Sequence, residues 1–237
     1  MEDGPDNSAT GRRSIRSFVV RAGRMTSGQQ KAMQALWPAY GIGHDDLLLD
    51  FDALFGRAAP RTLEIGFGNG DHLVALADAH RDADFIGIEV HPPGVGHLLQ
   101  QVAARQLANV RVACHDAVEV LARQVPEQSL DEVHILFPDP WHKKRHHKRR
   151  LIQEPFVALV ASRLKLGGVL RLATDWVPYA EHMLECLGRS PALRNLSSSG
   201  DYVPRPASRA PTRFERRGER LGHEVRDLAF ERLDRSA

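Results

Sequence analysis

The sequence is poor in cysteine and in aromatic residues. Two of its 237 residues are cysteine, and Phe, Trp and Tyr together make up 6% of the chain. Cys114 and Cys186 are too few for a disulfide framework, and neither belongs to a CxxC motif. This excludes a disulfide-stapled secreted fold and a cysteine-based metal or redox site. We expect both thiols to be buried and reduced.

Long apolar runs are also missing. No uninterrupted stretch approaches the roughly 20 apolar residues that cross a bilayer, and the first residues are acidic and polar. We therefore expect no membrane span, no secretory signal and a cytoplasmic protein. Hydrophobic content of 42% and charged content of 26% are ordinary for a globular chain. We predict one domain over residues 21–237, preceded by a disordered basic arm at residues 1–20.

The formal net charge of +2 hides a strong local imbalance. Basic residues gather at Arg12–Arg24, at Lys143–Arg150 and at Arg213–Arg220. Local fields matter more than the total charge for the choice of partner, so these clusters favour a polyanionic ligand at particular places on the surface.

A helix is predicted before the main repeating pattern begins. Ser27-Gly28-Gln29-Gln30 has the spacing of a capping box, which opens a short helix towards Trp37. Pro38 is expected to end it, because proline lacks the backbone N–H that a continuing helix needs.

From Arg61 onward, short apolar patterns alternate with amphipathic ones. Each crossover implies parallel strands, so we predict an α/β fold of the Rossmann-like class with a mostly parallel sheet and helices on both faces. Residues 224–233 are a further candidate strand that closes the sheet. The predicted strands are 62–65, 85–90, 110–114, 132–137 and 168–173, and the predicted helices are 72–79, 95–107, 117–124, 153–164 and 177–187.

A glycine-rich loop follows the first predicted strand. Gly66, Gly68 and Gly70 form a GxGxG motif before a helix, where glycine permits strained backbone angles and close approach of a ligand. A dinucleotide fingerprint needs its third glycine at position 71, which is Asp71 here, and a carboxylate at that helix start would repel a pyrophosphate. The loop therefore favours S-adenosylmethionine over NAD.

Acidic residues recur at the ends of three successive predicted strands. Glu64 could face the ammonium group of S-adenosylmethionine, Glu89 its ribose hydroxyls and Asp116 its adenine amino group. The alternative is that all three are solvent-exposed carboxylates beside an ordinary turn. We favour the cofactor interpretation because open α/β sheets bind ligands at the carboxyl ends of their strands.

The most unusual segment is FPDPW at Phe137–Trp141, which follows the fourth strand of the pattern. Pro138 and Pro140 restrict the backbone of Asp139 and would hold its carboxylate rigidly at the sheet edge, beside the expected methyl donor. We predict that Asp139 is the catalytic residue, that it also contacts the cofactor, and that it positions reactants rather than abstracting a proton.

A run of cations follows directly. Neighbouring cations repel one another unless an anionic partner is present, so we predict an RNA contact here. Trp141 and the histidines would add surfaces on which bases can stack. The alternative is a solvated basic loop. His142 and His146 have the spacing of a helical metal pair, but the cations around them oppose it and we predict no metal. The predicted RNA-binding residues are Arg145, His146, His147, Lys148, Arg149 and Arg150.

The sequence resembles the tRNA (guanine-N7)-methyltransferase family. The resemblance is carried by LEIGFGNG at residues 63–70, GIEVHPPGVG at 87–96, FPDPWHKKRHHKRR at 137–150, LATDW at 172–176 and TRFERRG at 212–218. It implies a class I methyltransferase fold that uses S-adenosylmethionine, with Glu64, Glu89 and Asp116 at the cofactor and Asp139 as the active-site carboxylate.

The resemblance also implies the substrate, a guanosine in the variable loop of tRNA, at position 46. Guanine or tRNA contacts then fall on Lys143, Asp175 and the segment 212–215, which is Thr212, Arg213, Phe214 and Glu215. Two alternatives stay open: Asp175 as the N-cap of the following helix, and Glu215 in a surface pair with a neighbouring arginine.

Two rival functions also stay open. An RNA-binding protein could keep this fold without catalysis, and a methyltransferase acting on the exocyclic amino group of adenine could use a related motif. The sequence does not decide between a monomer and a homodimer, or which tRNAs are accepted.

Overall fold

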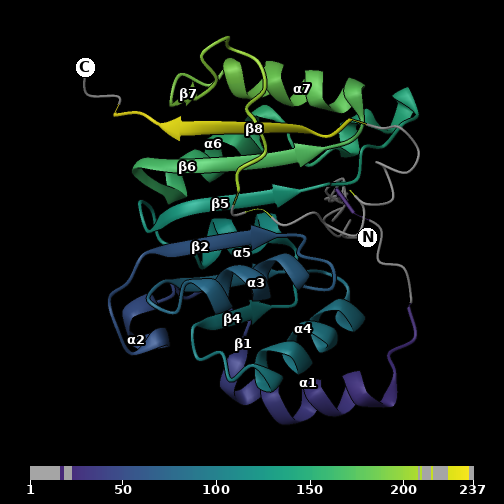
Figure 1. Cartoon of the computed structure of the whole chain (residues 1–237), viewed down its shortest axis with the longest axis vertical. Coiled ribbons are helices and arrows are strands. Elements are labelled where there is room, and N and C mark those ends of the chain that lie inside the picture. The colour runs from purple at the N-terminus through teal and green to yellow at the C-terminus, as the bar shows by residue number, and fades with distance from the viewer. Residues whose placement is uncertain (1–16, 19–22, 208, 210–214, 216–223, 235–237) are drawn as a thin grey trace, which may run out of the picture.

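The computed structural model describes residues 17–18, 23–207, 209, 215 and 224–234. They form an eight-stranded sheet in the order β1-β4-β3-β2-β5-β6-β8-β7 (Figure 1). The first six strands pair in parallel, whereas β8 runs antiparallel to both β6 and β7. The strands are β1 (Gly41–Ile42), β2 (Arg61–Ile65), β3 (Asp84–Ile88), β4 (Val110–Ala113), β5 (Leu130–Leu136), β6 (Leu164–Thr174), β7 (Leu193–Asn195) and β8 (Arg226–Arg232).

Helices cover both faces of this sheet. In Figure 1, α1, α3 and α4 lie in front of its lower part, and α5 and α6 lie behind it. None of the described helices is long and apolar enough to cross a membrane. The helices are α1 (Ser27–Tyr40), α2 (Phe51–Phe55), α3 (Asp71–Ala79), α4 (Pro92–Ala104), α5 (Ala117–Arg123), α6 (Glu154–Arg163) and α7 (Val177–Gly188).

Two apolar layers hold the helices to the sheet. One joins side chains of α5, α6 and α7 to alternate residues of the central strands, such as Leu63 and Ile135. The other joins α1, α3 and α4 to the opposite face, around Leu73 and Val95. Each of these four side chains is at most 1% exposed, and burying one contributes roughly 1.5–3 kcal/mol. The predicted α/β fold with helices on both faces is confirmed.

The first helix differs from its prediction at both ends. Thr26, not Ser27, is the N-cap: its Oγ1 accepts from Gln29 N at 3.2 Å and Gln29 Oε1 accepts from Thr26 N at 2.8 Å. Pro38 does not end the helix, which continues to Tyr40. A proline in the last turn removes a single hydrogen bond and already has a helical φ, so the turn can close around it.

Several short elements were not predicted. The strands β1 and β7 have two and three residues, and α2 has five, too few for a periodic pattern to be visible. β6 begins at Leu164, where a helix was predicted to end, because its first residues pair with β5 across a bulge. The strand predicted at residues 224–233 is confirmed as β8, but it lies between β6 and β7, so that β7 is the strand at this edge of the sheet.

The near face of β5, β6 and β8 is covered by a loop instead of a helix. The chain after β7 crosses these strands in Figure 1, and Val203 N donates to Asp227 O at 2.9 Å. A pocket open to solvent lies beneath this loop, lined by residues that include His72, His134 and Arg171. Charged and apolar side chains thus line this pocket together, the apolar ones including Leu136, Val203 and Leu228.

Candidate active site

The loops that follow β2, β3, β4, β5 and β6 emerge at one edge of the sheet, because these strands are parallel. The register places the glycine loop beside the FPDPW loop: Ile65, at the end of β2, lies opposite Ile135 of β5. Phe137 N then donates to Ala173 O of β6 at 2.8 Å. The two segments that the sequence singled out are therefore neighbours at the carboxyl edge.

All three glycines of the GxGxG motif have positive φ, with values of 72° for Gly66, 59° for Gly68 and 82° for Gly70. This conformation disfavours other residues, which confirms the predicted need for glycine. A Cβ on Gly94 of α4 would clash with the Gly68 carbonyl, so helix and loop are in close contact. A Cβ on Gly66 or Gly68 would meet nothing within 4 Å. The loop therefore presents bare backbone to open space.

Glu89 fixes the glycine loop from the neighbouring strand. Its carboxylate accepts hydrogen bonds from Gly68 N at 2.9 Å, from Val90 N at 2.7 Å and from His91 N at 3.0 Å. A carboxylate has about four acceptor positions, so part of its capacity is left. Its predicted contact with ribose hydroxyls stays a prediction, and the structure adds an anchoring role beside the loop.

The other two predicted cofactor carboxylates also have protein partners. Glu64 is 3% exposed, and its Oε2 lies 2.9 Å from Nδ1 of His72. Asp116 is the N-cap of α5 and accepts from Val118 N at 3.0 Å. The alternative of three solvent-exposed carboxylates does not fit the buried Glu64. The predicted contacts of both residues with a cofactor stay predictions.

The FPDPW loop is held in an unusual conformation. Phe137 and Trp141 have φ of 52° and 47°, values that aromatic residues rarely adopt. Such strain persists only where the surrounding structure imposes it, and it is frequent at functional sites. Between these ends Asp139 is exposed, and no described residue donates a hydrogen bond to its carboxylate. The loop thus presents an acidic side chain on a fixed backbone.

Contacts with three other parts of the chain hold this loop. The His142 ring meets Trp176, which follows β6, edge-on with centroids 4.3 Å apart. The Arg209 guanidinium lies 5.9 Å from the centroid of the Phe137 ring. Trp141 Nε1 donates to Ser17 O at 2.9 Å. The FPDPW loop is therefore brought together with Trp176 of the TDW motif and with Arg209, whereas the TRFERRG motif, except for Glu215, lies outside the described residues.

Glu215 belongs to a buried ionic cluster. Its carboxylate accepts from Arg209 Nη1 at 2.6 Å and Nη2 at 3.1 Å, and Arg209 Nε donates to Asp227 at 2.8 Å. All three residues are at most 6% exposed. Burial raises the pKa of Asp227 against the opposing effect of Arg209. The alternative that Glu215 forms a surface pair with an arginine is therefore wrong in one respect. The arginine partner is present, but the ion pair is buried in the protein.

The structure describes some of the remaining residues that were predicted to contact the substrate, but not all of them. Thr212, Arg213 and Phe214 lie outside the described residues, as do residues 1–16 of the predicted arm. Asp175 is half-buried and follows β6 directly. The N-cap of α7 is Trp176, so the alternative that Asp175 is the N-cap is wrong.

The basic segment forms a 3-10 helix over Lys144–Arg149, where a loop was predicted. Lys143, Arg145 and Lys148 are exposed on it, as an RNA contact requires. Burial, together with the surrounding cations, lowers the pKa of His146. The same surroundings favour the neutral form of the His146 ring, and His147 is half-buried beside it.

Arg149 and Arg150 point back into the protein. Arg149 stacks on the Trp141 ring at 4.0 Å and donates to Phe18 O at 3.2 Å. Arg150 is 4% exposed, donates to Pro140 O at 3.0 Å and lies over the Tyr179 ring. In this structure Arg150 holds the FPDPW loop and is not exposed for an RNA contact, because the chain turns inward ahead of α6.

A row of charged residues crosses the sheet beneath this edge. Glu64, His134 and Arg171 lie opposite one another on β2, β5 and β6. His134 Nε2 and Arg171 Nε contact Glu132 Oε2 at 2.7 and 3.2 Å. Burial would raise the pKa of Glu132, but the hydrogen bonds and charges of His134 and Arg171 lower it to about 2. Glu132 is thus held in its charged form.

We expect Glu132→Gln to remove a pH-dependent contribution to stability. A lowered native pKa stabilises the fold above the unfolded value of 4.5, and this contribution is lost as pH falls towards about 2. At pH 7 the variant should melt about 2–4 °C below the wild type. Melting curves from pH 6 to pH 3 should show this gap closing, and a gap that is constant with pH would contradict the ion-pair assignment.

The sequence did not reveal Arg209, Asp227 and His72 as partners of predicted site residues. Arg209 precedes Glu215 by six residues in a Pro- and Arg-rich stretch, and Asp227 is one of four charged residues in the seven-residue strand β8. The positions of Arg209 and Asp227 in the sequence become informative only when β8 is known to lie beside β6. His72 lies at the start of a helix pattern, where no sequence feature marks it as the partner of Glu64.

Known proteins resemble this chain over most of its length. A family model described as a putative methyltransferase matches residues 58–228. The tRNA (guanine-N(7)-)-methyltransferases of Escherichia coli strain K12 and of Shigella flexneri are each 57% identical to it over 231 residues. These matches cover 97% of this chain and 97% of each relative.

Solved structures share the fold at low identity. The 16S rRNA methyltransferase KamB superposes with a TM-score of 0.57 at 16% identity, over 79% of this chain and 95% of that one. The antibiotic-resistance methyltransferase Kmr gives 0.52 at 16% identity, over 79% and 93%. These likenesses support the fold. The family model and the relatives at 57% identity show to which family the sequence belongs. The chain belongs to the tRNA (guanine-N7)-methyltransferase family.

Proposed function

We propose that the protein transfers a methyl group from S-adenosylmethionine to N7 of a guanosine in tRNA, at position 46 of the variable loop, in the cytoplasm. The family supports the reaction. The observation that carries it here is the strained FPDPW loop, which presents Asp139 beside the glycine loop and before an exposed basic helix. We further propose that residues 21–237 act as one domain.

The residues at the carboxyl edge fit this cofactor. S-adenosylmethionine carries no phosphate, so it needs a loop that allows close approach together with polar anchors. Gly66 and Gly68 leave the space that a side chain would fill. Glu89 has acceptor capacity left for ribose hydroxyls, and Asp116 lies at the start of α5 for the adenine. Glu64 contributes through the oxygen that does not bind His72.

The bound cofactor supplies an electrophilic methyl group on a sulfonium. Guanine N7 carries a lone pair and no proton, so the reaction needs alignment and no base. Asp139 can accept hydrogen bonds from the N1 and amino protons of guanine, and its fixed backbone makes that orientation available before binding. Its negative charge also suits the positive charge of the reacting centre.

The exposed cations beyond Asp139 recruit the RNA. Arg145 and Lys148 lie exposed on one short helix directly after the acidic loop, and Lys143 lies exposed at the N-cap of that helix. Phosphate contacts fix the position of a nucleic acid without reading its sequence. Recruitment and methyl transfer are therefore assigned to adjacent but different residues.

The proposed reaction is tested by incubating the purified protein with labelled S-adenosylmethionine and unmodified tRNA, followed by nucleoside analysis. We expect 7-methylguanosine, lost when guanosine 46 is replaced by adenosine. N6-methyladenosine as the main product would favour the rival amino methyltransferase. Saturable tRNA binding without any methylated nucleoside would favour an RNA-binding protein that has lost catalysis.

We expect Gly68→Ala to fold and yet to lose cofactor affinity. Alanine at a φ of 59° costs roughly 1–2 kcal/mol, which lowers the melting temperature by only a few degrees in a chain of this size. The new methyl group would occupy the space beside the loop. Calorimetric titration with S-adenosylmethionine should show a dissociation constant at least about tenfold higher. Unchanged affinity would mean that the cofactor does not approach Gly68.

A further inference from the structure

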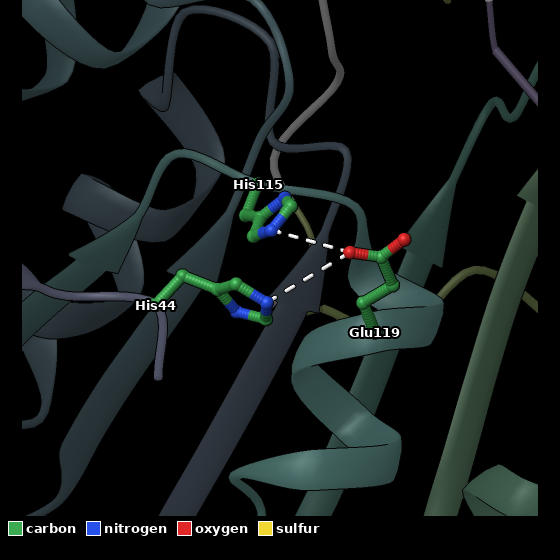
Figure 2. A group of neighbouring side chains, drawn as sticks. All are labelled: His44, His115 and Glu119. Atoms are coloured by element: carbon green, nitrogen blue, oxygen red, sulfur yellow. Dashed lines mark ion pairs between the residues drawn. The ribbon is translucent and has the colours of Figure 1, made fainter. Parts of the chain in front are cut away.

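Three side chains with metal-binding groups meet beside β1 and β4. His44 follows β1, His115 follows β4, and Glu119 lies in the first turn of α5. Figure 2 shows both imidazoles directed at the carboxylate. One donor atom from each residue lies within 4.8 Å of the other two. Segments 71 residues apart in the sequence are thus joined at one point.

The distances are close to those of an ion site. Nε2 of His115 lies 3.2 Å from Oε2 of Glu119, and Nε2 of His44 lies 3.8 Å from the same oxygen. Zinc bonds to nitrogen and oxygen measure about 2.0–2.2 Å, so two ligands of a tetrahedral ion lie about 3.3–3.5 Å apart. Both distances from an imidazole nitrogen to the carboxylate oxygen are thus within about 0.5 Å of those values, and the two imidazole nitrogens lie within 4.8 Å of each other.

A buried amide sets the tautomer of His44. Nδ1 of His44 lies 2.9 Å from Oε1 of Gln124, a residue that is 1% exposed. The amide group of Gln124 donates to Gly43 O at 2.7 Å, which fixes its oxygen as the acceptor. Nδ1 must then carry the proton, and Nε2 presents its lone pair to Glu119. Metal-bound histidines are oriented by the same kind of second hydrogen bond.

The cluster suits a cation better than two protonated histidines. The centroids of the two rings lie 3.6 Å apart, so two imidazolium groups would repel each other strongly. Two neutral imidazoles and one carboxylate instead form a donor set that borderline divalent metals prefer. The side chains are 28%, 32% and 42% exposed, so an ion can enter from solvent.

We propose that His44, His115 and Glu119 bind one divalent transition-metal ion of the Zn²⁺ class, with a fourth position left to water. The ion ties the connection between β1 and α2 to the start of α5. No metal was expected from the sequence, because the signal for this site is tertiary: His115 and Glu119 have a four-residue spacing, but His44 is remote. The proposal stands independently of the methyl-transfer reaction.

The test is Zn²⁺ binding to the untagged, metal-stripped full chain, measured by competition with a chromophoric chelator. We expect one tight site per chain. His115→Ala and Glu119→Gln should each weaken it at least about tenfold, because a three-ligand site loses a ligand. His80→Ala is the matched control, since His80 is an exposed histidine outside the cluster.

A second readout is thermal stability. Zn²⁺ at about a hundredfold excess over its dissociation constant should raise the melting temperature of the wild type and of His80→Ala by roughly 5 °C or more. The Glu119→Gln variant, which keeps the shape of the side chain, should respond at the same Zn²⁺ concentration by about half of that shift or less, since its affinity is at least about tenfold lower. Equal Zn²⁺ affinity in all variants, or tighter binding of Mg²⁺ than of Zn²⁺, would overturn the proposal.

Discussion

Replacing Asp139 by alanine should lower the turnover number by about 100-fold or more while changing tRNA affinity less than twofold. In the proposed mechanism the carboxylate acts on the reacting base from a fixed loop, and losing one such group typically costs 10²–10³ in rate. The phosphate contacts that we propose to dominate affinity lie elsewhere, on the exposed cations of the basic helix. Single-turnover methylation and filter binding of the same protein preparations separate the two quantities.

The conservative variant sharpens this prediction. Asp139→Asn keeps the shape but loses the charge, so intermediate activity would show that charge matters beyond hydrogen bonding. Asp82→Ala is a suitable control, because Asp82 is also an exposed aspartate and lies between α3 and β3, away from the carboxyl edge. A parallel loss of affinity and turnover in Asp139→Ala would refute the division of labour between loop and helix.

Neutralising Lys143, Arg145 and Lys148 together by glutamine should have the largest effect on binding. Three lost phosphate contacts, each worth about 0.7–0.9 in the log–log salt slope, should flatten that slope by about 2–3. We also expect the dissociation constant at low salt to rise more than about tenfold, because charge-assisted contacts are the strong ones. Titrations of tRNA at several salt concentrations measure both.

A matched triple variant distinguishes this effect from a general loss of charge. Arg81, Arg105 and Arg189 are exposed cations that follow α3, α4 and α7, towards the other edge of the sheet. Changing them to glutamine removes the same charge, and the slope should stay within experimental error. Equal flattening in both triple variants would mean that RNA does not dock on the basic helix.

The repeating part of the fold was predictable because its signals are local. Apolar strands and amphipathic helices alternate from Arg61 onward, and a parallel sheet follows from that order. Elements of two to five residues are too short to show a hydrophobic periodicity, so β1, α2 and β7 could not be predicted from the sequence. Pro38 was misread because the consequence of a proline depends on how many hydrogen bonds of the helix still follow it.

The residues of the candidate site that belong to local motifs could be predicted from the sequence. The contacts between side chains of different segments could not. The glycines, Glu89 and Asp139 are marked by motifs at strand ends. Whether a basic side chain faces solvent is decided by tertiary contacts, which turn Arg150 inward and leave Lys148 exposed. The buried partners of Glu215 depend on the pairing of β6 with β8, which no short-range pattern encodes.

The left-handed backbone at both ends of the FPDPW loop bears on the thermodynamics of association. A segment that is already fixed has little conformational freedom left to lose when a large ligand arrives, so this part of the surface adds almost no entropic penalty to complex formation. The same rigidity limits how its five residues can be varied. A natural or designed change in RNA specificity should therefore arise from substitutions in the flanking basic helix or in the C-terminal loop. The FPDPW loop should stay unchanged in such variants.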